Sequence, residues 1–238
     1  MKKRLLLSTI AVLCALSLSI ITASAWHDET HLAIAKAAGY PKWYNAAGPD
    51  IAKIKAGFTE GRNHYSDNNG VGKVTPEMVL AQVNRYNDPD DNGGHLYGAI
   101  IASLRTYTTV QKEGKYAQYH LAYCAHYLGD LSQPQHNSLF DEFNKIHHDA
   151  NDGVVENKVL KKINKIEKHM YPINLRLNYF ESDLAAEITR IANIARDLDS
   201  KLRKENRNMS QEEAYRQLGH SASLLKAILN LVINPNLI

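Results

Sequence analysis

A stripe of six apolar residues, spaced alternately four and three apart, is the feature that most restricts how this chain can fold. The stripe consists of Leu184, Ile188, Ile191, Ala195, Leu198 and Leu202. This spacing keeps all six side chains on one face of an α-helix. It predicts a long helix that buries the face in a core, since a dimeric coiled coil needs a longer repeat. The rest of the chain alternates helical patterns with polar, Gly-rich or Asn-rich breaks, and shows no convincing strand pattern, so we predict an all-α fold.

Capping signals place the starts of two helices. Thr75-Pro76 combines a hydroxyl cap with a proline in the first turn. Ser210 and Glu213 have the spacing of a capping box. Both signals agree with the all-α prediction.

The segment from Val155 to His169 is rich in lysine. In a continuous helix one face would carry Lys158, Lys161, Lys162, Lys165 and Lys168, and another would carry Val159, Ile163 and Ile166. We expect the lysine face to be solvated. The alternative is a surface that meets anionic lipid headgroups or nucleic-acid phosphates.

The first 25 residues have the form of a secretory signal. Three basic residues precede an apolar stretch from Leu5 to Ile21, and Ala23-Ser24-Ala25 matches a cleavage site. We expect a mature domain over residues 26–238, secreted or periplasmic after cleavage following Ala25. The leader holds three of the 28 basic residues and none of the 25 acidic ones, so the mature chain is formally neutral. This balance indicates no global attraction to nucleic acid, and no obligate protein partner is evident.

Histidines and carboxylates at ligand-like spacings are the strongest chemical signal. The central motif is His126-Tyr127-Leu128-Gly129-Asp130, followed by Gln133-Pro134 and His136. On a helix the four-residue spacing stacks His126 and Asp130 on one face, where they can bind metal. Pro134 then stops the helix and lets the chain bring His136 back toward that face.

Further candidate ligands lie on either side of this motif. His148 and Asp152 repeat the four-residue spacing, and Asp50 and His64 supply a carboxylate and an imidazole upstream. Cleavage after Ala25 would make Trp26 the first residue. Its free amine and carbonyl could then chelate a metal near His31.

These residues resemble the superfamily of bacterial zinc-dependent phospholipases C and S1/P1-type nucleases. The resemblance covers about half of the chain, from Trp26 to Asp152, and the central motif is its most specific part. It implies a compact, single-domain helical fold with three zinc ions in one cleft. One zinc would be held by Asp50, His64, His126 and Asp130, the second by Trp26, His31 and the bridging Asp130, and the third by His136, His148 and Asp152. His147 competes with His148, but the carboxylate four residues later favours His148.

The chemistry expected of such a cluster is phosphodiester hydrolysis. A zinc-bound water is deprotonated near neutral pH, and a metal pair about 3.5–4 Å apart can align the hydroxide with phosphorus. We assign Asp50 as the residue that orients or deprotonates the water, because a ligand carboxylate has a second oxygen available for the proton.

The substrate is predicted to be a phospholipid at a membrane surface, cleaved at its glycerol-side phosphoester. The resemblance to the phospholipase branch lies in the residues of the central motif and in two spacings, from Asp50 to His64 and from His136 to His148. The Asp-x-Gly-Gly-Asn loop of the nuclease branch is absent from the sequence. The close pair Trp26 and His31 is more nuclease-like, so a single-strand nuclease acting on nucleic acid is the alternative. A third hypothesis is a non-catalytic secreted zinc-binding protein.

Overall fold

The described residues, 26–110 and 116–233 of a computed structural model, form an all-helical structure without strands. The signal predicted for residues 1–25 lies outside them. The longer helices are α2 (Asp28–Ala37), α3 (Gly48–Ala56), α5 (Pro76–Gln82), α6 (Leu96–Val110), α7 (Ala117–Ser132), α8 (Glu142–Asp152), α11 (Phe180–Glu205) and α12 (Gln211–Val232). Short helices are η1 (Trp43–Asn45), α4 (Phe58–Gly61), η2 (Val83–Arg85), η4 (Pro134–Asn137), α9 (Glu156–Val159), α10 (Ile163–Glu167) and η5 (Leu177–Tyr179). Nowhere in these ranges is a helix both long and apolar enough to cross a bilayer.

The predicted apolar stripe lies in α11 and faces the core. Leu184, Ile188 and Ile191 are fully buried, as are Ala195 and Leu202, while Leu198 is partly buried. Tertiary packing within one chain therefore covers this face. The prediction of a core-facing helix is confirmed.

Both predicted helix starts are also confirmed. The Thr75 hydroxyl accepts a hydrogen bond from the Met78 amide, with Pro76 as the first residue of α5. Ser210 and Glu213 exchange the two reciprocal hydrogen bonds of a capping box at the start of α12. These signals are local in sequence, so they specify helix ends without tertiary information.

The lysine-rich segment differs from the expectation of one helix. It forms α9 and α10, which are separated near Lys162. α9 packs against α2, whereas α10 packs against both α2 and α12. Val159 and Ile166 are buried in these separate contacts. Packing against two surfaces replaces the single amphipathic face that the pattern predicted.

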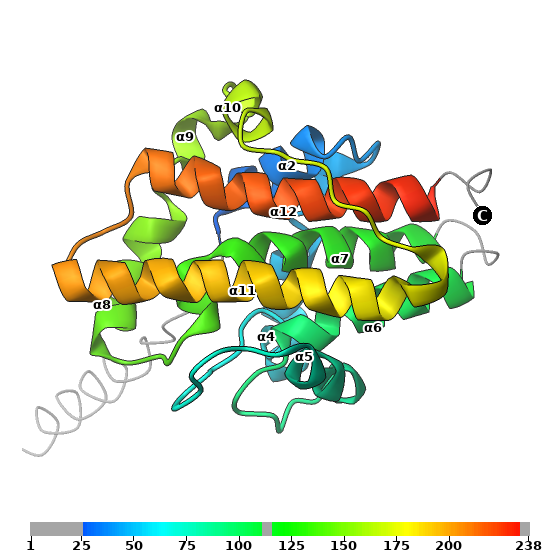
Figure 1. Cartoon of the computed structure of the whole chain (residues 1–238), viewed down its shortest axis with the longest axis horizontal. Coiled ribbons are helices and arrows are strands. Elements are labelled where there is room, and N and C mark those ends of the chain that lie inside the picture. Colours follow the sequence, from blue (N-terminus) through cyan, green and yellow to red (C-terminus); the bar gives the residue numbers. More distant parts are fainter. Residues whose placement is uncertain (1–25, 111–115, 234–238) are drawn as a thin grey trace, which may run out of the picture.

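Helix α7 is the centre of the fold. It packs against α6, α12, α11, α2 and α3. Figure 1 shows α11 and α12 as two long antiparallel helices in front of α7, with α2 above and α5 below. The Arg196 guanidinium of α11 donates to the Asn137 carbonyl at 2.8 Å and to the Val71 carbonyl. This contact fixes η4 at the end of α7.

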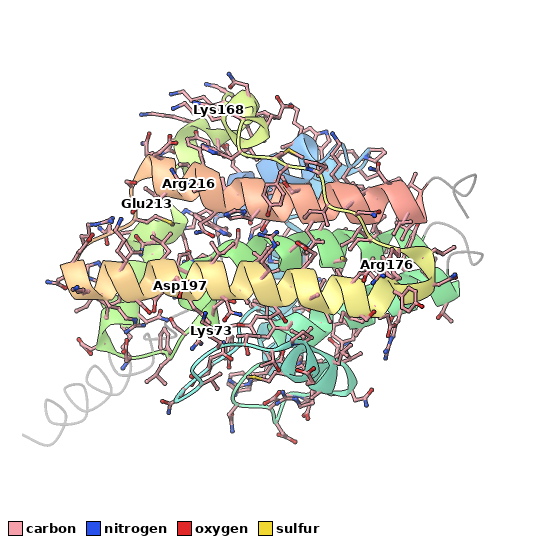
Figure 2. All side chains as sticks on the ribbon, in the orientation of Figure 1. Lys73, Lys168, Arg176, Asp197, Glu213 and Arg216 are labelled. Carbon is pink, nitrogen blue, oxygen red and sulfur yellow. The ribbon has the colours of Figure 1, made fainter. Side chains whose placement is uncertain are left out.

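Charged side chains of both signs project from the outer surfaces of these helices. Figure 2 labels Glu213 and Arg216 on α12, Asp197 on α11, and Lys73, Lys168 and Arg176 on other segments. The two signs are interspersed in this view, in keeping with the nearly balanced charge of the chain.

Candidate metal centre

Eight of the candidate ligands converge from six segments onto the side of α7 that carries His126 and Asp130. They form three groups whose ligand atoms lie within 4.8 Å of one another: His31 with His126 and Asp130; Asp50 with His64 and His126; and His136 with His148 and Asp152. His126 belongs to two groups. Such buried clusters of imidazoles and carboxylates could hold metal ions.

Asp130 connects the three groups. Its carboxylate oxygens lie 3.4 Å from His31 Nε2, 3.0 Å from His64 Nδ1 and 3.4 Å from His126 Nε2. Its Oδ1 also lies 3.5 Å from His136 Nδ1. The Asp130 side chain is fully buried, and neither oxygen has a hydrogen-bond partner among the described residues. Because a buried carboxylate without hydrogen bonds is costly, this arrangement suits a cation.

A glycine in the central motif makes room for His31. A Cβ atom at Gly129 would meet His31 Nδ1 at 2.4 Å. Without a side chain at this position, α2 approaches α7 closely enough for the His31 and His126 rings to stack, with centroids 3.7 Å apart. Neither ring nitrogen of His31 has a hydrogen-bond partner within the described chain. This imidazole is therefore free to donate a lone pair to a metal.

The short helix η4 places His136. Pro134 is in its first turn, and the Gln133 side chain caps it by accepting a hydrogen bond from the Gln135 amide. The turn brings His136 Nε2 to 2.9 Å from His148 Nε2, and His148 lies 3.2 Å from Asp152 Oδ2. His136 Nδ1 also lies 3.5 Å from Asp130 Oδ1 of α7, so the predicted return of His136 toward the α7 face is observed.

The structure separates the two adjacent histidines of α8. His148 belongs to one of the groups that could hold a metal ion, whereas His147 stacks on Phe143 and pairs with Asn208 at 2.5 Å. Trp26 is the first described residue and is fully buried. No ligand contact of its backbone is described, so its role as a chelate remains a prediction.

Several neighbouring groups orient these histidines. His126 Nδ1 lies 2.7 Å from the Ala46 carbonyl and His136 Nδ1 lies 2.7 Å from the His64 carbonyl. His148 Nδ1 lies 2.8 Å from Asn144 Oδ1. Each contact leaves the opposite nitrogen, Nε2, directed at a neighbouring ligand. Such contacts fix the tautomer and ring orientation of a metal-binding histidine.

The sequence interpretation missed Glu60. Its buried carboxylate lies 3.3 Å from His64 Nε2 and accepts a hydrogen bond from the Tyr127 hydroxyl at 2.7 Å. Glu60 and His64 are four residues apart, which is the same spacing as His126 and Asp130. This spacing could have identified Glu60. The sequence interpretation also missed the role of Gln133, whose side-chain amide donates a hydrogen bond to Asp152 Oδ1.

Four of the candidate ligands have pKa values shifted toward the protonation states that bind metal. Burial opposes ionisation of Asp130, but the nearby His126 and His136 hold its pKa well below the usual range. Asp50 likewise has a lowered pKa, since His126 and His64 outweigh its burial. Burial lowers the pKa of His126 to about 3 and that of His136 to about 4. Ionised carboxylates and neutral imidazoles are the forms that bind metal.

His64 and His148 behave differently from these two imidazoles, since the Asp152 carboxylate outweighs burial and raises the pKa of His148. Burial and the Lys53 charge act to lower the pKa of His64, but the adjacent Asp130 and Glu60 carboxylates raise that pKa to about 9. A proton on His64 would compete with a cation at Nδ1. Metal binding at this group therefore requires release of that proton.

No family model, curated protein or solved structure matches this chain. The geometry and chemistry of the ligand groups are therefore the basis for the function proposed below.

Proposed function

We propose that this protein is a zinc-dependent phosphodiesterase of the phospholipase C type, with the corresponding helical fold and three zinc ions. The observation that carries the proposal is the junction of two ligand groups through His126 and Asp130, with the third group adjacent at 3.5 Å between Asp130 and His136. A single structural zinc site needs only four protein ligands. Linked groups with shared ligands are instead typical of hydrolytic centres with several metals.

The donor atoms suit zinc. All eight described side chains offer nitrogen or oxygen atoms, a donor set that zinc shares with other divalent transition metals. When bound, zinc ions in such centres activate water and neutralise negative charge that develops on a phosphoryl group. We assign the second zinc to His31, Asp130 and the terminal amine and carbonyl of a processed Trp26.

Asp50 is the residue proposed to orient or deprotonate the attacking water. Its side chain is 17% exposed, whereas those of Asp130, His126 and His31 are fully buried. Asp50 therefore lies where water and substrate can approach the cluster. One carboxylate oxygen can serve as a ligand while the other accepts the proton of the attacking water.

The surface next to Asp50 favours a phospholipid over nucleic acid. Ile51, Ile54 and Phe58 follow Asp50 in α3 and α4, and their exposed fractions are 61%, 83% and 67%. Exposed apolar side chains close to a site are typical of a surface that meets another apolar surface. Stacking platforms for bases would require aromatic rings, and of these three side chains Phe58 alone has one.

The test is hydrolysis by zinc-loaded protein that begins at Trp26, assayed in parallel on a phospholipid panel and on single-stranded nucleic acid. His126→Ala should abolish activity and metal binding. His120→Ala, on the same helix but outside the ligand groups, should retain both. Diacylglycerol release supports the proposal, and nucleotide release supports the nuclease alternative. Zinc binding without either activity would indicate the non-catalytic protein.

A further inference from the structure

Lys53 is a cation at the exposed edge of the ligand groups. Its Nζ lies 2.8 Å from Asp50 Oδ1, and its side chain is 22% exposed. Among the other seven candidate ligand side chains of the described residues, His148 has the largest exposed fraction, at 11%. A substrate that reaches the cluster past Asp50 therefore passes the ammonium group of Lys53.

The position of this ammonium group is defined by contacts along the side chain. An added Cβ at Gly61 would lie 3.9 Å from Lys53 Cγ and Cδ, so the aliphatic stem lies across Gly61. The Lys53 charge acts on His64 in one ligand group and on His148 in another. The ammonium group is thus held beside the ligand group that contains Asp50, with its side chain only 22% exposed.

We infer that Lys53 determines the charge of the substrate that the site accepts. This inference rests on the proposed function. A phosphodiester beside the cluster would bring the substituent on its far side close to Lys53. The Lys53 ammonium group would repel a cationic substituent, and the repulsion is strong because the site is partly shielded from water. The site therefore selects a phospholipid with an anionic or uncharged headgroup over one with a quaternary ammonium headgroup.

Lys55 provides a matched control. It lies two residues later on α3 and is exposed. No ion pair or hydrogen bond to the ligand groups is described for it. A general effect of helix charge on an anionic substrate would involve both lysines, whereas a site effect involves Lys53 alone.

The experiment compares dihexanoyl phosphatidylglycerol with dihexanoyl phosphatidylcholine, both as dissolved monomers so that membrane surface charge plays no part. The full processed chain, loaded with zinc, should prefer the glycerol headgroup in kcat/KM. We expect Lys53→Met to reduce the ratio of the two kcat/KM values at least tenfold, and Lys53→Glu to reverse the preference. Lys55→Glu should keep the original ratio. Zinc content, measured for each variant, separates a change of selectivity from a loss of metal.

An unchanged ratio in both Lys53 variants would overturn the inference, even if their overall rates fall. Binding of the phosphorylated headgroups gives a second readout that does not need turnover. Glycerol phosphate should bind the zinc-loaded protein more tightly than phosphocholine does, and Lys53→Glu should remove that difference. If the protein hydrolyses no phosphodiester, the proposed function fails, and these binding measurements alone decide the role of Lys53. Equal binding of the two headgroups would then refute it.

Discussion

At the scale of single residues, the absence of a side chain at Gly129 allows His31 to stack on His126. We expect Gly129→Ala to push His31 away from His126, because the new methyl group would lie 2.4 Å from His31 Nδ1. The expected result is loss of bound metal and a fall of about 1–3 kcal/mol in the free energy of unfolding. Metal analysis and urea denaturation measure both. Gly72→Ala, where a Cβ meets nothing within 4 Å, is the control. Full metal content in the Gly129 variant would contradict the close approach of α2 and α7.

Replacement of Glu60 tests whether a carboxylate that contacts the candidate ligand His64 contributes to metal binding. We expect Glu60→Gln to weaken metal binding about 10-fold to 100-fold, because the carboxylate that faces His64 Nε2 is lost. A competition titration with a chromogenic chelator measures the change. Glu142→Gln, at an exposed position, should leave the affinity as it is. Equal affinities in the two variants would limit Glu60 to its hydrogen bond with Tyr127.

At the scale of elements, helix α12 carries His220, which should make the fold less stable in acid. Burial, followed by the charges of Arg190 and Arg216, lowers the pKa of His220 to about 4. The unfolded chain takes up this proton at about pH 6.5. Between these values the unfolded state binds more protons, so the free energy of unfolding falls as the pH falls from about 6.5 to 4.

His220→Gln should reduce that fall. Urea denaturation of both proteins at pH 7.5 and pH 5 measures it, and the contributions of the ligand histidines cancel in the comparison. The same loss of stability in both proteins would show that His220 does not contribute.

The helices and caps of this structure could be predicted from the sequence more fully than the packing of the helices against one another. The α11 stripe and the Ser210 cap depend on residues within a few positions of each other, so spacing alone was sufficient. The break between α9 and α10 depends on which neighbours each half meets, and no periodicity contains that information. The same division applies within the site. The spacing from His126 to Asp130 predicted one shared face, but the stacking of His31 on His126 depends on how α2 crosses α7.

At the scale of the whole molecule, the proposed centre requires a correctly processed chain. We predict that one extra residue ahead of Trp26 removes one zinc ion and most of the activity, because the terminal amine is then no longer free to chelate. Zinc stoichiometry and hydrolysis rates of chains beginning at Trp26 and at Ala25 test this. Full zinc content and activity in the longer chain would refute the assignment of Trp26.

The order of the elements along the chain has a consequence for biosynthesis. All described ligands precede residue 153, whereas α11 and α12, which pack against α7, begin only at Phe180 and Gln211. A growing polypeptide therefore contains every candidate ligand side chain before these two helices have been made. Until those last helices are in place, the histidines and carboxylates are open to any cation in their surroundings. The cations present where α11 and α12 fold onto α7 would then decide which metal the chain keeps.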